Sequence, residues 1–302
     1  FQDKGVIGAT VPGLPAVFIG RNRAYGWGVT AAQMDDQDLF IEKLNPDNPD
    51  QYLTPDGWAE IQSRSETIRI NGEEPREVTL RWTRHGPVLP PKVYDVGAVT
   101  PEGHVAALSW TALTAEDRVL EYLLRNMRAN SIDDAVEATV NALAPAVNVI
   151  MADQSGVGIV LAGQAPRRQS DSRSQGRIPS LGWVPENDWN GLIETWETPR
   201  SIRPRSGIVA NANNRVTNAP FPNHISFDWA APYRMRRIEQ RLNGREFHTR
   251  ESFIELQNDA VSEMARSVLP LAARLIVHLL HARARARAHA RVARVGGERR
   301  GR

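Results

Sequence analysis

Residues 24–44, with the sequence AYGWGVTAAQMDDQDLFIEKL, set the architecture of this chain. Ala24–Ala31 has the apolar character of a buried strand, and Leu39–Leu44 forms a second apolar run of strand length. Between them, Gln33–Asp38 is polar and rich in aspartate, which is typical of an exposed loop. The stretch therefore predicts two strands joined by an acidic loop.

Further strands are predicted on both sides of this stretch. Val6–Ile19 consists of short apolar pieces broken by prolines and a glycine, which predicts strand, turn and strand. Residues 45–58 are rich in turn-forming residues. Thr67–Ile70 and Val78–Trp82 flank Asn71-Gly72, a pair that favours positive φ, so we expect a hairpin there.

The rest of the chain mixes strands and helices. Apolar runs predict strands at Ala106–Thr111, Val147–Ala152, Val157–Ala162 and Ile208–Asn211, the middle two joined as a hairpin. Helices are predicted at Thr114–Met127, Ser131–Leu143, Ala231–Leu242 and Ser252–Leu280, with Thr114 and Ser131 as N-caps and an interruption near Pro270. Residues 165–206 are rich in Arg, Ser and Pro and predict an irregular excursion. This order favours an α+β fold with an antiparallel sheet covered by helices.

Composition limits the chemistry of the chain. Its 302 residues include no cysteine, so disulfides, cysteine metal sites and a cysteine nucleophile are excluded. The formal charge of +2 comes from residues 283–302, which hold eight of the 37 basic and one of the 35 acidic residues, leaving the remainder near −5. We interpret this Arg-rich tail as a disordered end or the product of a shifted reading frame. Binding of nucleic acid through the tail is the alternative that we favour less.

Common catalytic motifs are absent from the sequence, including GxGxxG, the P-loop, HExxH and GxSxG. His85 and His224 each stand alone, and we interpret both as structural. Asp35-Asp36-Gln37-Asp38 admits two interpretations, a solvated acidic turn or a Ca²⁺ loop, because Ca²⁺ prefers oxygen ligands. The asparagines of Asn211-Ala-Asn-Asn214 could donate to an oxyanion, although asparagine is also an ordinary turn former.

Together these blocks resemble the penicillin acylase family. The similarity is carried by Pro12-Gly-Leu-Pro15, Ile19-Gly-Arg-Asn22, Trp27-Gly-Val-Thr30, Asp35-Asp-Gln-Asp-Leu39, Glu42-Lys-Leu44, Thr83-Arg-His-Gly-Pro87, Asp188-Trp-Asn-Gly191, Ala210-Asn-Ala-Asn-Asn-Arg215 and Leu256-Gln-Asn-Asp-Ala-Val-Ser262. It covers residues 1–275 as a β-chain segment, with residues 276–302 as a separate low-complexity tail. The resemblance implies an incomplete four-layer αββα sandwich of the N-terminal-nucleophile hydrolases.

The resemblance also implies a mechanism. In this family a precursor cleaves itself, and the new N-terminal serine attacks an amide carbonyl with its own α-amine as base. An acyl-enzyme forms, the amine leaves, and water releases the acid. The implied substrate is an acyl amide, such as a β-lactam side chain or an acyl-homoserine lactone. The implied partner is an α-chain from the same precursor, and the implied location is the periplasm or the outside of the cell.

The family's site residues can be carried over position by position. The resemblance implies oxyanion donors at the backbone of Ala31 and the side chain of Asn213, with Arg234 organising the site. It implies Ca²⁺ ligands at Asp35, Gln37, Asp38, Gly176 and Asn223, where the family's pattern has Asp at the last position. It implies an acyl pocket containing Ile19, Val29 and Val147, three apolar residues that also suit a core. No organic cofactor, nucleic acid or membrane span is expected.

Residue 1 of this sequence is Phe rather than the serine of the family. We therefore expect residues 1–302 alone to be inactive. A non-catalytic remnant that keeps the fold is the alternative to an enzyme segment. We also expect such a partial sandwich to expose apolar surface and to be poorly soluble by itself.

Overall fold

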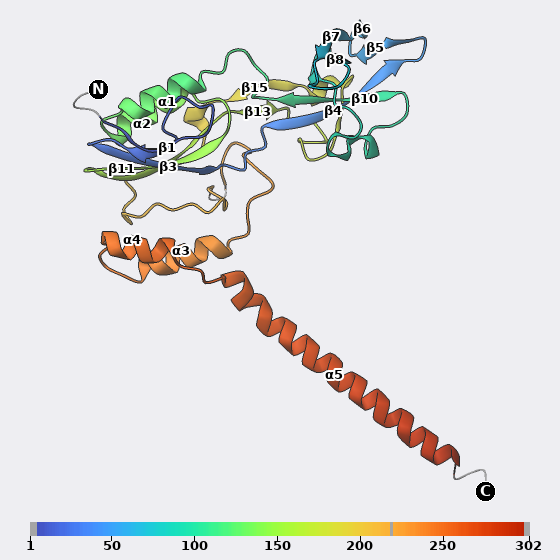
Figure 1. The fold of residues 1–302 in the computed structure, drawn as a ribbon, viewed down its shortest axis with the longest axis vertical. Helices are drawn as coiled ribbons and strands as arrows, with labels where there is room; N and C mark the ends of the chain where they lie inside the picture. Colours follow the sequence, from blue (N-terminus) through green and yellow to red (C-terminus); the bar gives the residue numbers. More distant parts are fainter. Residues whose placement is uncertain (1–4, 218–219, 299–302) are drawn as a thin grey trace. The chain divides into compact units, whose positions relative to one another are not determined.

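The computed structural model describes residues 5–217 and 220–298 (Figure 1). Strand β3 lies within its largest sheet. Six strands follow the order β1-β2-β3-β11-β12-β16, and every neighbouring pair is antiparallel. Their bounds are β1 Ile7–Ala9, β2 Ile19–Arg21, β3 Tyr25–Ala31, β11 Val147–Asp153, β12 Gly156–Ala162 and β16 Arg200–Ile202. The predicted β3 and the β11–β12 hairpin are confirmed, the latter with Asp153 opposite Gly156.

Two helices cover one face of this sheet, α1 Val119–Arg128 and α2 Ile132–Ala138 (Figure 1). Ile132 and Ala135 are fully buried in one core cluster with Val149 and Val160 of the sheet. Burying such aliphatic side chains stabilises the fold by roughly 1.5–3 kcal/mol each. The helices thus fix the position of the central strands.

The two helix starts differ in how well the sequence predicted them. Ser131 caps α2 as expected, because its hydroxyl oxygen accepts a hydrogen bond from the backbone N–H of Asp134 at 3.1 Å. The predicted start of α1 at Thr114 is wrong, since the helix begins at Val119. The Thr114 hydroxyl instead accepts from Glu116 N–H in a local turn, an alternative that Thr offers the backbone. The predicted end at Leu143 is also too late, because α2 passes into a 3₁₀ turn, η2 Thr139–Asn141.

A second sheet begins where the acidic loop ends. Its strands follow the order β10-β4-β5-β6, with β14 parallel to β4, and the bounds are β4 Gln37–Asn45, β5 Asn48–Thr54, β6 Gly57–Glu60, β10 His104–Trp110 and β14 Ser180–Leu181. Residues 45–58, predicted from composition as turns, form two strands with a Pro-Asp turn before each. Proline at the first corner and aspartate at the second favour tight turns. These residues therefore form short turns between strands, and the residues between the turns form the strands.

The Asn71-Gly72 hairpin is confirmed. It joins β7 Gln62–Ile68 to β8 Arg76–Thr83, and β9 Gly86–Pro87 completes this three-stranded sheet. A 3₁₀ segment, η1 Val93–Ala98, follows.

Residues 165–206 contain more regular structure than an irregular excursion. Strands β13 Ala165–Arg168 and β15 Trp189–Ile193 pair with each other, and short 3₁₀ turns lie at η3 Pro185–Asn187 and η4 Thr195–Glu197. The predicted strand Ile208–Asn211 is wrong, because residues 208–211 lie outside every sheet. The apolar residues of this segment belong to a loop, and a short apolar run alone does not distinguish a loop from a strand.

Residues from Ala231 onward form a second compact unit, and the boundary after 275 stays a prediction. It holds α3 Tyr233–Asn243, α4 Arg250–Gln257 and α5 Glu263–Glu298. The helix predicted over Ser252–Leu280 breaks at 258–262 rather than at Pro270, which lies inside α5. Helix α5 also continues into the Arg-rich tail, where Ala and Arg have high helix propensity. Residues 299–302 lie outside the described residues, and the origin of the tail stays a prediction.

Candidate functional site

The end of strand β3 presents a backbone donor. Ala32 donates its N–H to the carbonyl oxygen of Ala146 at 3.2 Å. Successive N–H groups of an antiparallel strand alternate in direction, so the N–H of Ala31 points away from β11. On that side β2 pairs with β3 through Gly20–Trp27 and Arg21–Gly26, and the ladder ends before Ala31. Ala31 is exposed, and its part as an oxyanion donor stays a prediction.

Asn213 is brought to Ala31 from a distant loop. Its side-chain Nδ2 donates to the Ala31 carbonyl oxygen at 2.8 Å. Its backbone has φ 58, the left-handed conformation that asparagine tolerates better than most residues. Its own N–H donates to Oδ1 of Asn211 at 2.9 Å, which closes a local turn. The two predicted oxyanion donors therefore lie together, while their role stays a prediction.

A buried polar cluster supports this loop from β11. Asn148 lies opposite Thr30 in the ladder and donates from Nδ2 toward Thr30 Oγ1, the Ala31 carbonyl and Asn211 Oδ1, each at 3.3 Å. The Thr30 hydroxyl donates to Asn211 Oδ1 at 2.6 Å. Because the backbone N–H of Asn213 can only donate, the acceptor oxygen of Asn211 is the atom that faces it. Sequence reasoning missed Asn148, since an isolated asparagine in an apolar strand has no pattern.

Asp35, in the acidic loop, contacts a later segment of the chain. Its Oδ2 lies 2.6 Å from Nε2 of His224 and accepts the backbone N–H of Phe227 at 2.9 Å. Its own N–H donates to the Ile225 carbonyl. Next to it, burial raises the pKa of Asp36 above its ordinary value. His224 is thus tied to the loop, in keeping with a structural role.

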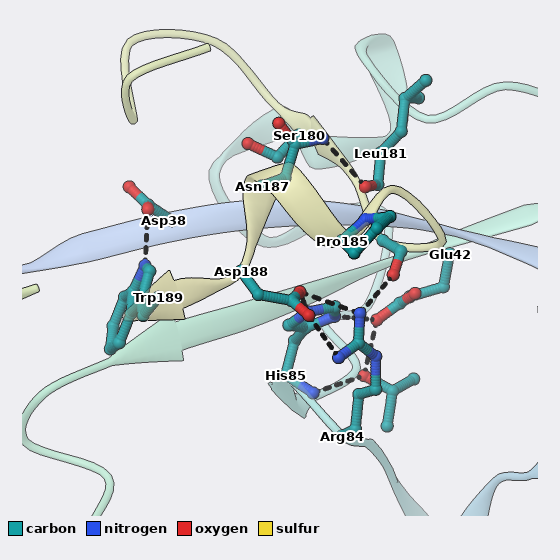
Figure 2. A network of polar contacts seen from close by, with 12 residues as sticks. Asp38, Glu42, Arg84, His85, Ser180, Leu181, Pro185, Asn187, Asp188 and Trp189 are labelled. Atoms are coloured by element: carbon teal, nitrogen blue, oxygen red, sulfur yellow. Dashed lines mark hydrogen bonds and ion pairs between the residues drawn. The ribbon is translucent and has the colours of Figure 1, made fainter. Parts of the chain in front are cut away.

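Asp38 is paired with an arginine. Nε and Nη2 of Arg168 donate to its carboxylate at 2.8–3.2 Å. Nε1 of Trp189 donates to Oδ2 at 2.7 Å (Figure 2). Nη2 of Arg168 also reaches the backbone oxygen of Asp35 at 2.9 Å. Sequence reasoning missed Arg168, because it lies among many arginines in a segment without periodicity.

The other predicted Ca²⁺ ligands are scattered around this pair. Gly176 lies directly against it, since a Cβ there would come within 2.4 Å of Asp38 Oδ1. Gln37 begins β4 opposite Trp110, and Asn223 donates from Nδ2 toward the Glu197 carbonyl at 3.4 Å. Among the described residues, no group of three or more His, Cys, Asp or Glu side chains could hold a metal ion. With a guanidinium on Asp38 and Asp35, this donor set does not fit Ca²⁺, and we derive no step through a metal.

The predicted acyl-pocket residues do not share one face. Val29 and Val147 lie with the core cluster beneath α1 and α2. Gly20 pairs with Trp27, which lies on the same face of the sheet as Val29. Because successive residues of a strand alternate between faces, the side chain of Ile19 lies on the opposite face. Its residue surface is 45 % exposed. The positions of Val29 and Val147 favour the core interpretation.

Arg234 lies in the first turn of α3, in the second unit. Its part in organising the oxyanion donors stays a prediction.

A second polar network lies along β4 (Figure 2). Glu42 is fully buried, and its Oε1 accepts from the Thr83 hydroxyl at 2.8 Å and lies 2.7 Å from Nδ1 of His85. Nε2 of His85 lies 3.0 Å from Asp188 Oδ1, and Arg84 donates to both oxygens of Asp188 at 2.8 Å. Burial acts to raise the pKa of Asp188, but the hydrogen bonds from Arg84 and His85 outweigh it and lower that pKa.

His85 is buried against a neighbouring aromatic ring, and its structural role stays a prediction. Its side chain is 8 % exposed and its ring stacks on Phe40 with centroids 3.7 Å apart. His85 also lines a cleft of about 610 Å³, together with Trp110, Leu143, Trp189 and Glu194. None of the predicted site residues lines this cleft, so it is distinct from the Ala31–Asn213 pair.

The helix-covered antiparallel sheet and the second sheet form the fold of an N-terminal-nucleophile hydrolase. The thermostable penicillin G acylase from Alcaligenes faecalis has a similar structure, with a TM-score of 0.73, 26% sequence identity, and coverage of 84% of this chain and 44% of that chain. The penicillin amidase family matches residues 2–295, and the chain belongs to this family.

Two curated relatives illustrate the similarity in sequence. The acyl-homoserine lactone acylase QuiP of Pseudomonas aeruginosa is 30% identical over 260 residues, which cover 84% of this chain and 30% of the relative. The penicillin G acylase of Escherichia coli is 30% identical over 241 residues, which cover 78% of this chain and 27% of the relative. The chain thus spans less than a third of the length of these relatives.

Proposed function

We propose that this chain is the oxyanion-stabilising part of an amide hydrolase that works through an acyl-enzyme. The observation that carries the proposal is the hydrogen bond from Asn213 Nδ2 to the carbonyl oxygen of Ala31, which brings a side-chain amide to the last residue of strand β3. Two fixed donors suit the negative oxygen of a tetrahedral intermediate, and losing one costs about 10²–10³ in rate. Membership of the penicillin amidase family supports the same reaction class.

The reaction follows from these groups and a serine contributed from outside residues 1–302. The serine hydroxyl attacks the amide carbon while its α-amine accepts the proton. The carbonyl oxygen becomes an oxyanion that accepts hydrogen bonds from Ala31 N–H and Asn213 Nδ2. Collapse of the intermediate breaks the C–N bond, the protonated amine leaves, and water then hydrolyses the ester to the acid.

The substrate class in this proposal is an N-acyl amide, with an acyl-homoserine lactone as the first candidate. Support comes from QuiP, whose name states that activity, and an aromatic acyl amide is the second substrate to test because of the penicillin G acylases. We propose an α-chain from the same precursor as the partner, in line with a relative named as a proenzyme, Penicillin acylase 2 proenzyme. Location in the periplasm stays a prediction, and none of the helices in the described residues has the length and hydropathy needed to cross a bilayer.

The test uses the full-length gene product, processed to a serine-led β-chain. We expect release of homoserine lactone or of the amine of an aromatic acyl amide. Asn213→Gly should lower kcat by about 10²–10³ with little change in KM, because the donor acts on the oxyanion. Asn71→Gly, the same change in the exposed hairpin loop, is the matched control and should leave kcat unchanged. Absence of turnover by the processed protein would support the non-catalytic remnant instead.

A further inference from the structure

The guanidinium of Arg168 lies against three of the residues that the family resemblance implied as Ca²⁺ ligands, Asp35, Asp38 and Gly176. It donates to the Asp38 carboxylate, which is one of the expected ligands, and to the backbone oxygen of Asp35, whose side chain is another. The side chains of Arg168 and Asp38 are 6% and 3% exposed. A positive group of this chain therefore already neutralises the buried carboxylate.

The side-chain oxygens of Asp38 and Asp35 have further partners. Trp189 donates to Asp38 Oδ2 at 2.7 Å, and Asp35 Oδ2 is held by His224 and the N–H of Phe227. A divalent ion at Asp38 would have to displace the guanidinium or lie beside it, and two positive charges about 4 Å apart repel strongly in a buried site. The planar guanidinium can bridge two oxygens at once, which is the geometric task of a bound cation.

Gly176 closes the site over this pair. Its Cα position places a hypothetical Cβ 2.4 Å from Asp38 Oδ1 and 2.5 Å from Nε of Arg168, and its φ is +74. Residues 175–177 thus pack directly on the ion pair with a residue that has no side chain. Because glycine has no side chain, the backbone can approach this closely, and the guanidinium of Arg168 fills the space beside the Asp38 carboxylate.

We propose that Arg168 takes the place of a divalent cation, as the built-in positive charge that ties the Asp35–Asp38 loop to strand β13. The loop connects β3, which ends at Ala31, to β4. Arg168 is therefore a positioning residue for the end of β3, and the chain holds this loop without Ca²⁺.

The experiment measures thermal unfolding of the full-length gene product in EDTA and in millimolar CaCl₂. We expect the wild-type Tm to be the same in both. Arg168→Ala leaves Asp38 as a buried charge with no positive partner and with Trp189 as a remaining donor, so its Tm in EDTA should fall by about 10 °C. Calcium should restore part of that loss, because the vacated space and the freed carboxylate then admit a cation. Arg167→Ala is the matched control, since the neighbouring arginine forms a half-exposed pair with Glu197 and should show a small loss and no response to calcium.

A second readout is Tb³⁺ luminescence sensitised by Trp189, whose indole nitrogen lies 2.7 Å from the Asp38 carboxylate. We expect no sensitised emission from the wild-type chain and strong emission from Arg168→Ala. The double variant Arg168→Ala/Asp38→Asn should regain stability and lose the emission, and it covers the case in which the single variant does not fold. Calcium stabilisation of the wild-type chain, or emission from it that Asp38→Asn abolishes, would overturn the proposal. So would an Arg168→Ala variant that folds and binds neither ion.

Discussion

Asn213 donates a hydrogen bond from its side-chain amide to the carbonyl oxygen of Ala31, at 2.8 Å and across 182 positions of sequence. The contact joins the end of strand β3 to the loop between β16 and α3. It depends on the left-handed backbone of Asn213, which aims the amide at β3. A backbone conformation of this kind at a proposed site is a strain that the surrounding hydrogen bonds hold in place.

Two substitutions at Asn213 distinguish the cost of its left-handed backbone from the contribution of its side-chain amide. Asn213→Ala should be less stable than Asn213→Gly by about 1 kcal/mol, because alanine pays for a left-handed φ that glycine adopts freely. Urea denaturation of both variants measures the difference directly. Equal stabilities would mean that the loop leaves the left-handed conformation once the amide is removed.

Local patterns predicted the parts of the fold that local forces determine. The strand β3, the β11–β12 hairpin and the Ser131 cap each follow from a few neighbouring residues, namely an apolar run, a tight turn and a hydroxyl before a helix. The Ile208–Asn211 run is as apolar as a strand, yet it has no partner strand in the described residues. Whether an apolar run becomes a strand depends on what lies beside it, which sequence spacing does not contain.

The candidate site shows the same limit. Ala31 and Asn213 were predicted through the family resemblance, and the structure brings them together. Arg168 and Asn148 reach Asp38 and Ala31 from more than a hundred residues away, and neither stands in a motif. A salt bridge or a buried amide of this kind is created by tertiary packing, so only the folded structure reveals it.

His85 is predicted to hold the buried Glu42 in place. Removing its ring with His85→Ala leaves a fully buried carboxylate with one donor fewer, so we expect a loss of about 3 kcal/mol in the free energy of unfolding. His104→Ala is the matched control, since that ring contacts a backbone oxygen near the surface. In a Glu42→Gln background the cost of His85→Ala should shrink, and an unchanged cost would assign the effect to lost packing on Phe40 alone.

Asp188 is predicted to make the fold sensitive to acid. Its pKa in the folded chain lies below the ordinary value of 3.8, so its contribution to stability is fully present above that pH and is lost as the pH falls through the lowered pKa. Asp188→Asn should therefore lose less stability than the wild-type chain as the pH falls below about 4. Unfolding free energies across this range provide the test, with the exposed turn residue Asp47→Asn as control. Parallel curves for Asp188→Asn and the wild-type chain would contradict the prediction.

Gly182 is predicted to be intolerant of any side chain. A Cβ at this position would lie 1.9 Å from Oε2 of Glu42, and that carboxylate is held by Thr83 and His85 and so cannot swing away. Gly182→Ala should cost about 2–3 kcal/mol, the usual range for forced overpacking. Gly28→Ala provides the contrast, because nothing lies within 4 Å of its Cβ position. Chemical denaturation of the two variants should separate them clearly, and a Gly182→Ala chain as stable as Gly28→Ala would show that the Glu42 side chain yields without disturbing its partners.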